Sequence, residues 1–182
     1  RRAVADEPDA GPPDVEAIQR TVDRALGLEK ELLVAPAFWP ALAARLPQVD
    51  SVTLLRKPGR AHNELTRHRY DVILATSSPE TPTGGGDRVV GIQDPRTSGE
   101  VVAAELAARG DIAAAKVALA TRDGQEPEDL IAEAAARGVT AVAVPGARLG
   151  TYDLVLGDAP ATYTGPRPDV VANDPSASRR AT

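Results

Sequence analysis

The sequence predicts an α/β fold in which helices flank a sheet that contains an antiparallel strand pair. Three observations lead to this prediction. Segments with apolar residues at helical spacing alternate with short runs rich in Val, Leu and Ile. Gly and Pro separate these segments. Hydrophobic residues make up 42% of the 182 residues, and with only one Trp, one Phe and three Tyr the core must be filled mainly by Ala, Val and Leu.

Five segments are predicted to be helices from their apolar spacing and from the residues at their ends. They lie at residues 14–26, 36–46, 98–109, 112–120 and 127–137. The Ala-rich segment among them, the fourth, is the most ambiguous. Asp14 and Ser98 are placed to cap helix starts. Gly27, Gly110 and Gly138 follow three of the segments and should end them.

Five shorter segments are predicted to be strands because they are rich in β-branched and aromatic residues and are bounded by turn residues. They lie at residues 51–56, 65–75, 88–92, 139–144 and 152–156. The first two should pair antiparallel across the Pro-Gly turn at 57–63. The run 70–75 (YDVILA) is nearly all apolar, so we expect it to be buried, and we expect the same of 88–92.

The ends of the chain are rich in Pro, Asp, Ser and Ala and lack periodicity, which is typical of linkers. The expected organisation is a linker at 1–13, one α/β domain at 14–168 and a linker at 169–182. Loop 79–86 would join halves at 14–78 and 87–168. Within each half one helix and two strands follow in the same order, at 36–46, 51–56 and 70–75 and at 127–137, 139–144 and 152–156, and the second strand contains Tyr-Asp-x-x-Leu. A duplicated helix–hairpin unit and chance similarity in a Val- and Leu-rich chain are both open interpretations.

The composition excludes several classes of protein. The absence of Cys removes disulfides and thiolate chemistry, and a net charge of −5 argues against a general nucleic-acid or membrane-surface binder. No apolar run approaches the ~20 residues of a membrane span. We expect a cytoplasmic, bacterial protein. Because there is no Met, even at position 1, we also expect a segment of a longer protein or a processed product.

Motifs for common enzyme chemistry are lacking. The sequence has no nucleophile elbow, no P-loop and no His-Glu-x-x-His motif. The run Gly84-Gly85-Gly86 precedes a predicted strand rather than a helix, so we interpret it as a linker and predict no cofactor-binding and no metal-binding residues. The weak catalytic candidates are His62, Glu64, His68 and Asp71. They could form His–carboxylate pairs for general acid–base work, although a polar hairpin is the simpler interpretation.

Basic side chains gather in the predicted hairpin, where residues 51–70 carry five positive charges and one negative charge. The cations are Arg56, Lys57, Arg60, Arg67 and Arg69. Three interpretations are open: a solvated hairpin, a set of intramolecular salt bridges, or a docking patch. The docking interpretation rests on the bidentate way in which Arg binds anionic groups, such as those on a carrier protein.

Residues 31–75 resemble the late part of the methyltransferase domains embedded in nonribosomal peptide synthetases and hybrid polyketide synthases. The matching residues are Glu31-Leu32, Pro36, Phe38-Trp39, Arg56-Lys57, Gly59, Asn63-Glu64-Leu65-Thr66-Arg67 and Arg69-Tyr70-Asp71-Val72. The resemblance continues through Pro95-Arg96, the segment 126–142 and the strand YDLVL to the VANDP sequence at Val171–Pro175, and thus covers about residues 29–175.

The resemblance implies a truncated methyltransferase-like fold, in which the sheet-closing part is present and the cofactor-binding half is not. It implies no cofactor for this chain alone, and S-adenosylmethionine only with an upstream half. The implied partners are neighbouring synthase domains and an acyl or peptidyl carrier protein. A domain of unassigned function in leinamycin-type polyketide synthases is a related resemblance.

This resemblance leaves two functions open. The first is a non-catalytic structural or docking domain of a modular polyketide or nonribosomal peptide synthase. The alternative is the C-terminal part of an S-adenosylmethionine-dependent methyltransferase domain that is active only with its upstream half.

Overall fold

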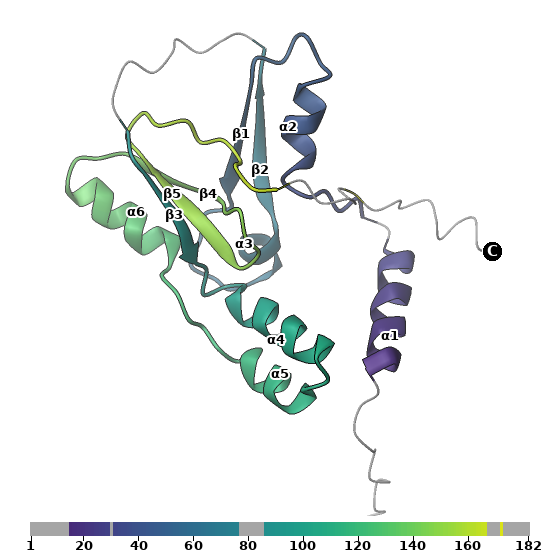
Figure 1. Cartoon of the computed structure of the whole chain (residues 1–182). Coiled ribbons are helices and arrows are strands. Elements are labelled where there is room, and N and C mark those ends of the chain that lie inside the picture. Colours follow the sequence, from purple (N-terminus) through teal and green to yellow (C-terminus); the bar gives the residue numbers. More distant parts are fainter. Residues whose placement is uncertain (1–14, 30, 77–85, 167–171, 173–182) are drawn as a thin grey trace, which may run out of the picture.

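The computed structural model describes residues 15–29, 31–76, 86–166 and 172. The predicted linkers at 1–13 and 169–182, Ala172 excepted, lie outside the described residues, as do Asp14 and most of loop 79–86. Within the described ranges the chain forms helices and two antiparallel sheets (Figure 1), which confirms the α/β class. The predicted domain bounds remain a prediction.

The elements follow the predicted order, with one addition. The helices are α1 (Val15–Leu28), α2 (Phe38–Ala43), α3 (Glu64–His68), α4 (Ser98–Ala108), α5 (Ile112–Ala118) and α6 (Pro127–Ala136). The strands are β1 (Ser51–Arg56), β2 (Tyr70–Ala75), β3 (Arg88–Gln93), β4 (Ala141–Pro145) and β5 (Thr151–Leu156). Gly110 and Gly138 end α4 and α6 as predicted, with φ of 84° and 75°. Helix α1 runs one residue past Gly27.

Two of the predicted elements are shorter than expected because tight turns replace their ends. Helix α2 covers only the middle of the predicted segment 36–46, and its flanks form turns such as the one in which Phe38 N donates to Ala35 O at 3.0 Å. Strand β4 begins after Thr140. The N–H of Val139, before the strand, donates a hydrogen bond to Ala134 O at 3.0 Å and so belongs to the turn that ends α6.

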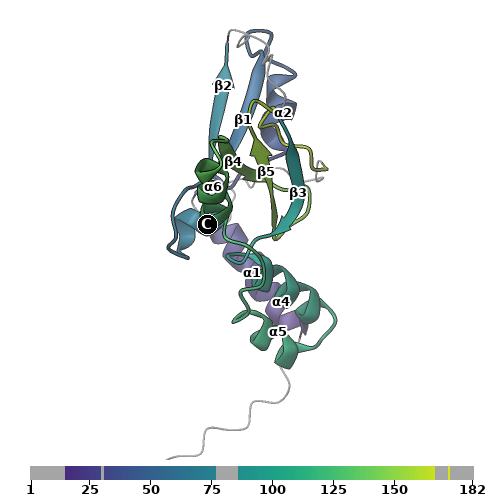
Figure 2. The same ribbon diagram turned by 90° about the vertical axis from the view of Figure 1, so that its left-hand side faces the viewer.

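The strands form two sheets that meet along β1 and β4. Strands β1 and β2 pair antiparallel, as predicted, with Arg56 opposite Tyr70. The second sheet has the order β3-β5-β4, so that β5 lies in the centre and runs antiparallel to both neighbours. Strand β1 lies beside β4 (Figure 1). Helix α6 packs on the second sheet, whereas α4 and α5 pack on each other below it (Figure 2).

A short helix replaces the first part of the strand predicted at 65–75. Asn63 caps this helix, α3, because its Oδ1 accepts hydrogen bonds from the backbone N–H groups of Leu65 and Thr66 at 3.0 and 3.2 Å. The Thr66 hydroxyl in turn accepts from Asn63 N at 3.3 Å. This reciprocal cap stabilises a helical turn, so the strand begins only at Tyr70.

The burial predicted for 70–75 and for 88–92 is wrong. Ile73 in β2 is 51% exposed and Val90 in β3 is 67% exposed. Both residues lie on strands at the edge of their sheets, where one side of the strand has no neighbour in the described structure. The core instead gathers around the central strand β5, where Tyr152 and Val155 are buried, together with Leu54 of β1.

An isolated backbone bridge joins the segment before α2 to the last described residue. Val34, before α2, forms an isolated antiparallel bridge with Ala172. The segment around Ala161 returns to the sheets in the same region, where Leu54 N donates to Ala161 O at 3.4 Å. The chain therefore enters and leaves the two-sheet body at neighbouring positions.

Two glycines provide a test of how tightly the loops pack on the sheets. Both Gly124 and Gly138 have positive φ, 127° and 75°. A Cβ at Gly124 would collide with the Gln93 carbonyl, 2.7 Å from its carbon, whereas a Cβ at Gly138 would meet nothing within 4 Å. In urea unfolding followed by circular dichroism, Gly138→Ala should cost about 1–2 kcal/mol from its backbone conformation. Gly124→Ala should cost clearly more because backbone must also move, and equal costs would contradict this packing.

Candidate functional site

A cluster of five charged side chains lies where β1, β3 and α6 meet. Arg56 is the last residue of β1, and Asp94 and Arg96 follow β3 directly. Glu126 and Glu128 flank Pro127 at the start of α6. We call these five residues the ionic junction. Asp94 is held in place by its backbone, because its N–H donates to Gly150 O at 2.9 Å and its carbonyl accepts from Ser98 N at 2.8 Å.

Arg96 is the central cation of the ionic junction, and its side chain is fully buried. Its Nε donates to Glu126 Oε2 at 3.0 Å, and its Nη2 pairs with Glu128. Nη1 lies 3.4 Å from Lys57 O and 3.5 Å from Thr66 O. A buried charge is tolerated only when it is paired and hydrogen-bonded. Arg96 meets that condition by joining α6 to the β1–β2 hairpin.

Arg56 and Asp94 form a second buried pair in the ionic junction. The Asp94 side chain is 0% exposed and that of Arg56 is 12% exposed. Arg56 Nη2 contacts Asp94 Oδ2 and also donates to Thr66 O at 3.2 Å, while Asp94 Oδ1 accepts from Arg96 N at 3.0 Å. Burial lowers the pKa of Arg56, and the Asp94 charge acts in the opposite direction. Because arginine is a far stronger base than the other side chains, Arg56 remains a cation at neutral pH.

The two Tyr-Asp-x-x-Leu sequences use their first two residues in the same way. Tyr152 donates its hydroxyl to Gln125 O at 2.9 Å, and Asp153 accepts from Arg88 at 2.7 Å. Tyr70 donates to Val34 O at 2.5 Å, and Asp71 pairs with Lys57. The two tyrosines are parallel, because each binds a carbonyl just before the helix of its unit, but Asp71 pairs within its unit and Asp153 pairs with Arg88 of β3, outside its unit. Asp153 is nearly fully buried while Asp71 is half-exposed, so the two copies differ in depth.

The structure does not bring the four weak catalytic candidates together. His62 pairs with Glu126, Glu64 with Arg69, His68 lies 3.7 Å from Glu100, and Asp71 pairs with Lys57. The turn of α3 is the reason, because it replaces the extended backbone on which His62 and Glu64 would have shared a face. Across the described residues, no group of three or more His, Asp or Glu side chains could hold a metal ion.

Each of the five basic hairpin residues has a carboxylate partner within the chain. The pairs are Arg56–Asp94, Lys57–Asp71, Arg60–Asp129, Arg67–Glu100 and Arg69 with both Glu31 and Glu64. Of the three interpretations drawn from the sequence, this geometry favours intramolecular salt bridges. The use of these residues in docking stays a prediction.

Most of the ionic junction is not evident from the sequence. Arg56 belongs to the basic hairpin, whereas Arg96, Glu126 and Glu128 lie in segments of the family resemblance that imply no role for them. Asp94 has no predicted role. A local signal was present, because charged residues flank a proline in both Asp94-Pro95-Arg96 and Glu126-Pro127-Glu128. Such a signal does not show which charges meet.

Comparison with known proteins relates the chain to nonribosomal peptide synthetases. It is 35% identical over 159 residues, 78% of this chain, to a probable non-canonical nonribosomal peptide synthetase (CymA) of Salinispora arenicola. It is 41% identical over 69 residues (37% of this chain) to the nonribosomal peptide synthetase TES of Alternaria alternata. It is 43% identical over 56 residues (31% of this chain) to the chondramide synthase of Chondromyces crocatus.

These relatives are far longer than the region they share with this chain. The chain spans 2% of the length of the Salinispora relative and 1% of each of the other two. The chain is thus homologous to a part of nonribosomal peptide synthetases. No protein-family model matches it. None of the helices in the described ranges combines the length and apolar character needed to cross a membrane.

The buried position of Arg96 predicts a large effect of its removal. In Arg96→Met the carboxylates of Glu126 and Glu128 lose their buried partner, and the free energy of unfolding should fall by about 3–5 kcal/mol. Arg137→Met is the matched control, because Arg137 is an exposed partner of Glu133 in the same helical region. Its effect should stay below about 1 kcal/mol. Urea denaturation measures both, and similar values for the two variants would contradict the assigned role of Arg96.

The surroundings of His68 predict an acid-shifted titration. Burial, followed by the charges of Arg67 and Arg56, lowers the pKa of His68. Replacing Arg67 by Gln removes one repelling cation and frees Glu100, so the pKa of His68 should rise. NMR titration of the histidine Cε1–H resonances follows this directly. A pKa that stays the same or falls in Arg67→Gln would show that Arg67 does not act on His68.

Proposed function

We propose that this chain is a non-catalytic structural and docking domain within a nonribosomal peptide synthetase or a related modular synthase. The observation that carries the proposal is the ionic junction. Its two arginines pair with its three carboxylates, and these pairs join β1, β3 and the start of α6. A general acid or base needs a proton or lone pair that is available to a substrate. The Arg96 guanidinium and the carboxylates of Glu126 and Glu128 are engaged with each other instead.

The ionic junction also supports a mechanical role. Buried ion pairs are directional, so they fix the relative positions of the elements that carry them. Arg67 extends the same set of contacts, because its Nε donates to Arg96 O at 3.0 Å and its guanidinium pairs with Glu100 of α4. Helices α3, α4 and α6 are thereby tied to both sheets. Such a body is suited to hold neighbouring domains at a set distance.

The comparisons support the proposed setting. The relatives are synthetases of which this chain matches a small part, so a domain of this kind has many neighbours in the same polypeptide. We propose those neighbouring domains, and an acyl or peptidyl carrier protein, as the partners. The exposed cations Arg60 and Arg69 are the candidates for a docking contact with an acidic partner, in exchange for their present carboxylates.

The alternative proposal is the C-terminal part of an S-adenosylmethionine-dependent methyltransferase domain. The observation that favours it is the β1–β2 pair. The residues of the family resemblance, Asn63–Arg67 and Arg69–Val72, fall on α3, its caps and β2, and β2 pairs antiparallel with β1 in a two-stranded sheet of its own. The resemblance implies an antiparallel pair of this kind closing the sheet. In this alternative, the upstream half supplies cofactor binding.

Three titrations test these proposals. Isothermal titration with S-adenosylmethionine should give no binding, because neither proposal places a cofactor site here; a micromolar Kd would overturn both. Repeating the titration with the upstream sequence of the parent synthetase restored separates them, since binding then supports the methyltransferase alternative.

A ¹⁵N-labelled chain titrated with the adjacent carrier protein should show amide shifts near α3. The docking role fails if no neighbouring domain causes shifts.

A further inference from the structure

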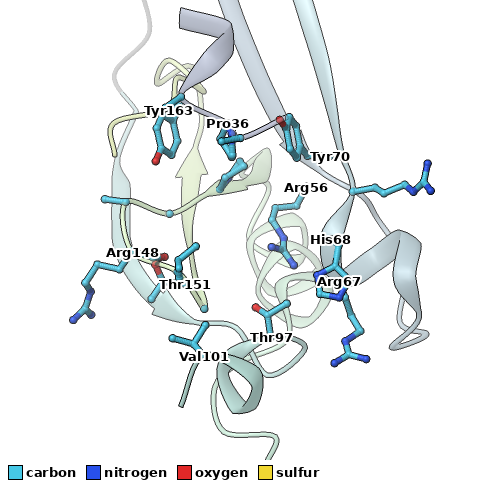
Figure 3. A pocket seen from close by; sticks show the side chains of 18 of the residues that line it. Pro36, Arg56, Arg67, His68, Tyr70, Thr97, Val101, Arg148, Thr151 and Tyr163 are labelled. Carbon is cyan, nitrogen blue, oxygen red and sulfur yellow. Dashed lines mark hydrogen bonds between the residues drawn. The ribbon is translucent and has the colours of Figure 1, made fainter. Parts of the chain in front are cut away.

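A cavity of about 530 Å³ lies between α3, the start of α4 and the turn that joins β4 to β5. Figure 3 shows Tyr163, Pro36 and Tyr70 along one side and Thr97 and Val101 on the opposite side, with Arg56 between them. The volume falls in the range of roughly 300–1,000 Å³ that is typical of small-molecule sites.

The walls of the cavity are largely apolar. They come from the stretch 34–37, from Val101 and from the Pro-Gly-Ala sequence at 145–147. The hydroxyl of Tyr70 is already engaged, because it donates to Val34 O and accepts from Trp39 Nε1 at 3.0 Å. These walls can therefore cover an apolar body, and offer it few hydrogen bonds.

The charge of the lining is strongly positive for an acidic protein. Four arginines and one glutamate line the cavity, giving a formal charge of +3 where the whole chain carries −5. The glutamate, Glu100, is occupied by Arg67, and Arg69 is occupied by Glu31 and Glu64. Because Arg56 is also paired, with Asp94, the capacity of this cavity to hold an anion depends on guanidinium donors that these pairs leave unused.

Arg56 is the cation best placed to receive an anion. Its Nη2 is used by Asp94 and by Thr66 O, and within the described part of the chain its Nη1 has no acceptor. Its Nε is buried without a hydrogen-bond partner. Figure 3 shows the Arg56 side chain directed into the cavity, whereas that of Arg148 points away from it. A buried guanidinium with unused donors gains free energy from a further acceptor.

We propose that this cavity binds an amphipathic anion, a small molecule with an apolar body and one carboxylate or phosphate head, with the head held at Arg56. The apolar walls cover the body, and Nη1 of Arg56 donates to the head. The binding of this anion does not depend on the structural role proposed above, although both involve Arg56. The ionic junction then has two faces, with Arg56 paired to Asp94 on the inner side and open to a ligand on the outer side.

The test uses three eight-carbon probes at concentrations below micelle formation: octanoate, octyl phosphate and octanol. Binding to the ¹⁵N-labelled 182-residue chain is followed by amide shifts. Octanoate or octyl phosphate should bind at least tenfold more tightly than octanol, with shifts at Thr97, Val101 and Gly150. The tighter of the two identifies the preferred head group. No binding by either anion, equal binding of octanol, or shifts elsewhere would each overturn the proposal.

A pair of matched variants tests the role of Arg56. Arg56→Lys keeps the cation but removes the planar fork, so the affinity for the preferred anion should fall about tenfold. Arg88→Lys is the control, because Arg88 also pairs with a buried carboxylate, that of Asp153, but does not line the cavity. The Arg88→Lys variant should bind the anion with the same affinity as the unchanged chain. Circular dichroism verifies that both variants are folded. Unchanged affinity in a folded Arg56→Lys variant would remove Arg56 as the anchor.

Discussion

The burial of one guanidinium group, that of Arg96, constrains most of this structure. A charge with no exposed surface must meet its partners at fixed positions, because an unpaired ion in the interior is very costly. Here the partners come from the start of α6 and from two backbone carbonyls of the hairpin region, at Lys57 and Thr66. The guanidinium of Arg96 therefore fixes the relative positions of three parts of the chain: the end of β3, the first turn of α6 and the turn before α3.

Local sequence signals predicted the elements well and their surroundings poorly. Helix ends at Gly110 and Gly138 follow from glycine's freedom to adopt positive φ, which is a property of one residue. The exposure of Ile73 and Val90 depends on which strands lie at a sheet edge, and no local pattern encodes that. The cap of α3 was visible in the sequence as Asn63 and Thr66, but the apolar run after it favoured a longer strand.

The ion pairs of the hairpin and the ionic junction could not be predicted from the sequence, because the paired residues are distant along the chain. Arg60 and Asp129 are 69 residues apart, and Arg96 and Glu126 are 30 apart. Counting charges in the hairpin could show an excess of cations but not the carboxylates that neutralise them. The family resemblance contributed what physical reasoning from single residues could not. The relation to nonribosomal peptide synthetases is supported by the relatives, and the methyltransferase identity stays a proposal.

The bridge between Val34 and Ala172 has a geometric consequence for any longer polypeptide that contains this unit. Residues opposite each other in an antiparallel pair have Cα atoms only about 5 Å apart. Everything folded between these two positions hence adds almost nothing to the straight-line path from one flank to the other. Tension applied to the two flanks would load this pair of backbone segments and the ion pair between Glu31 and Arg69, which joins the leading flank to the hairpin.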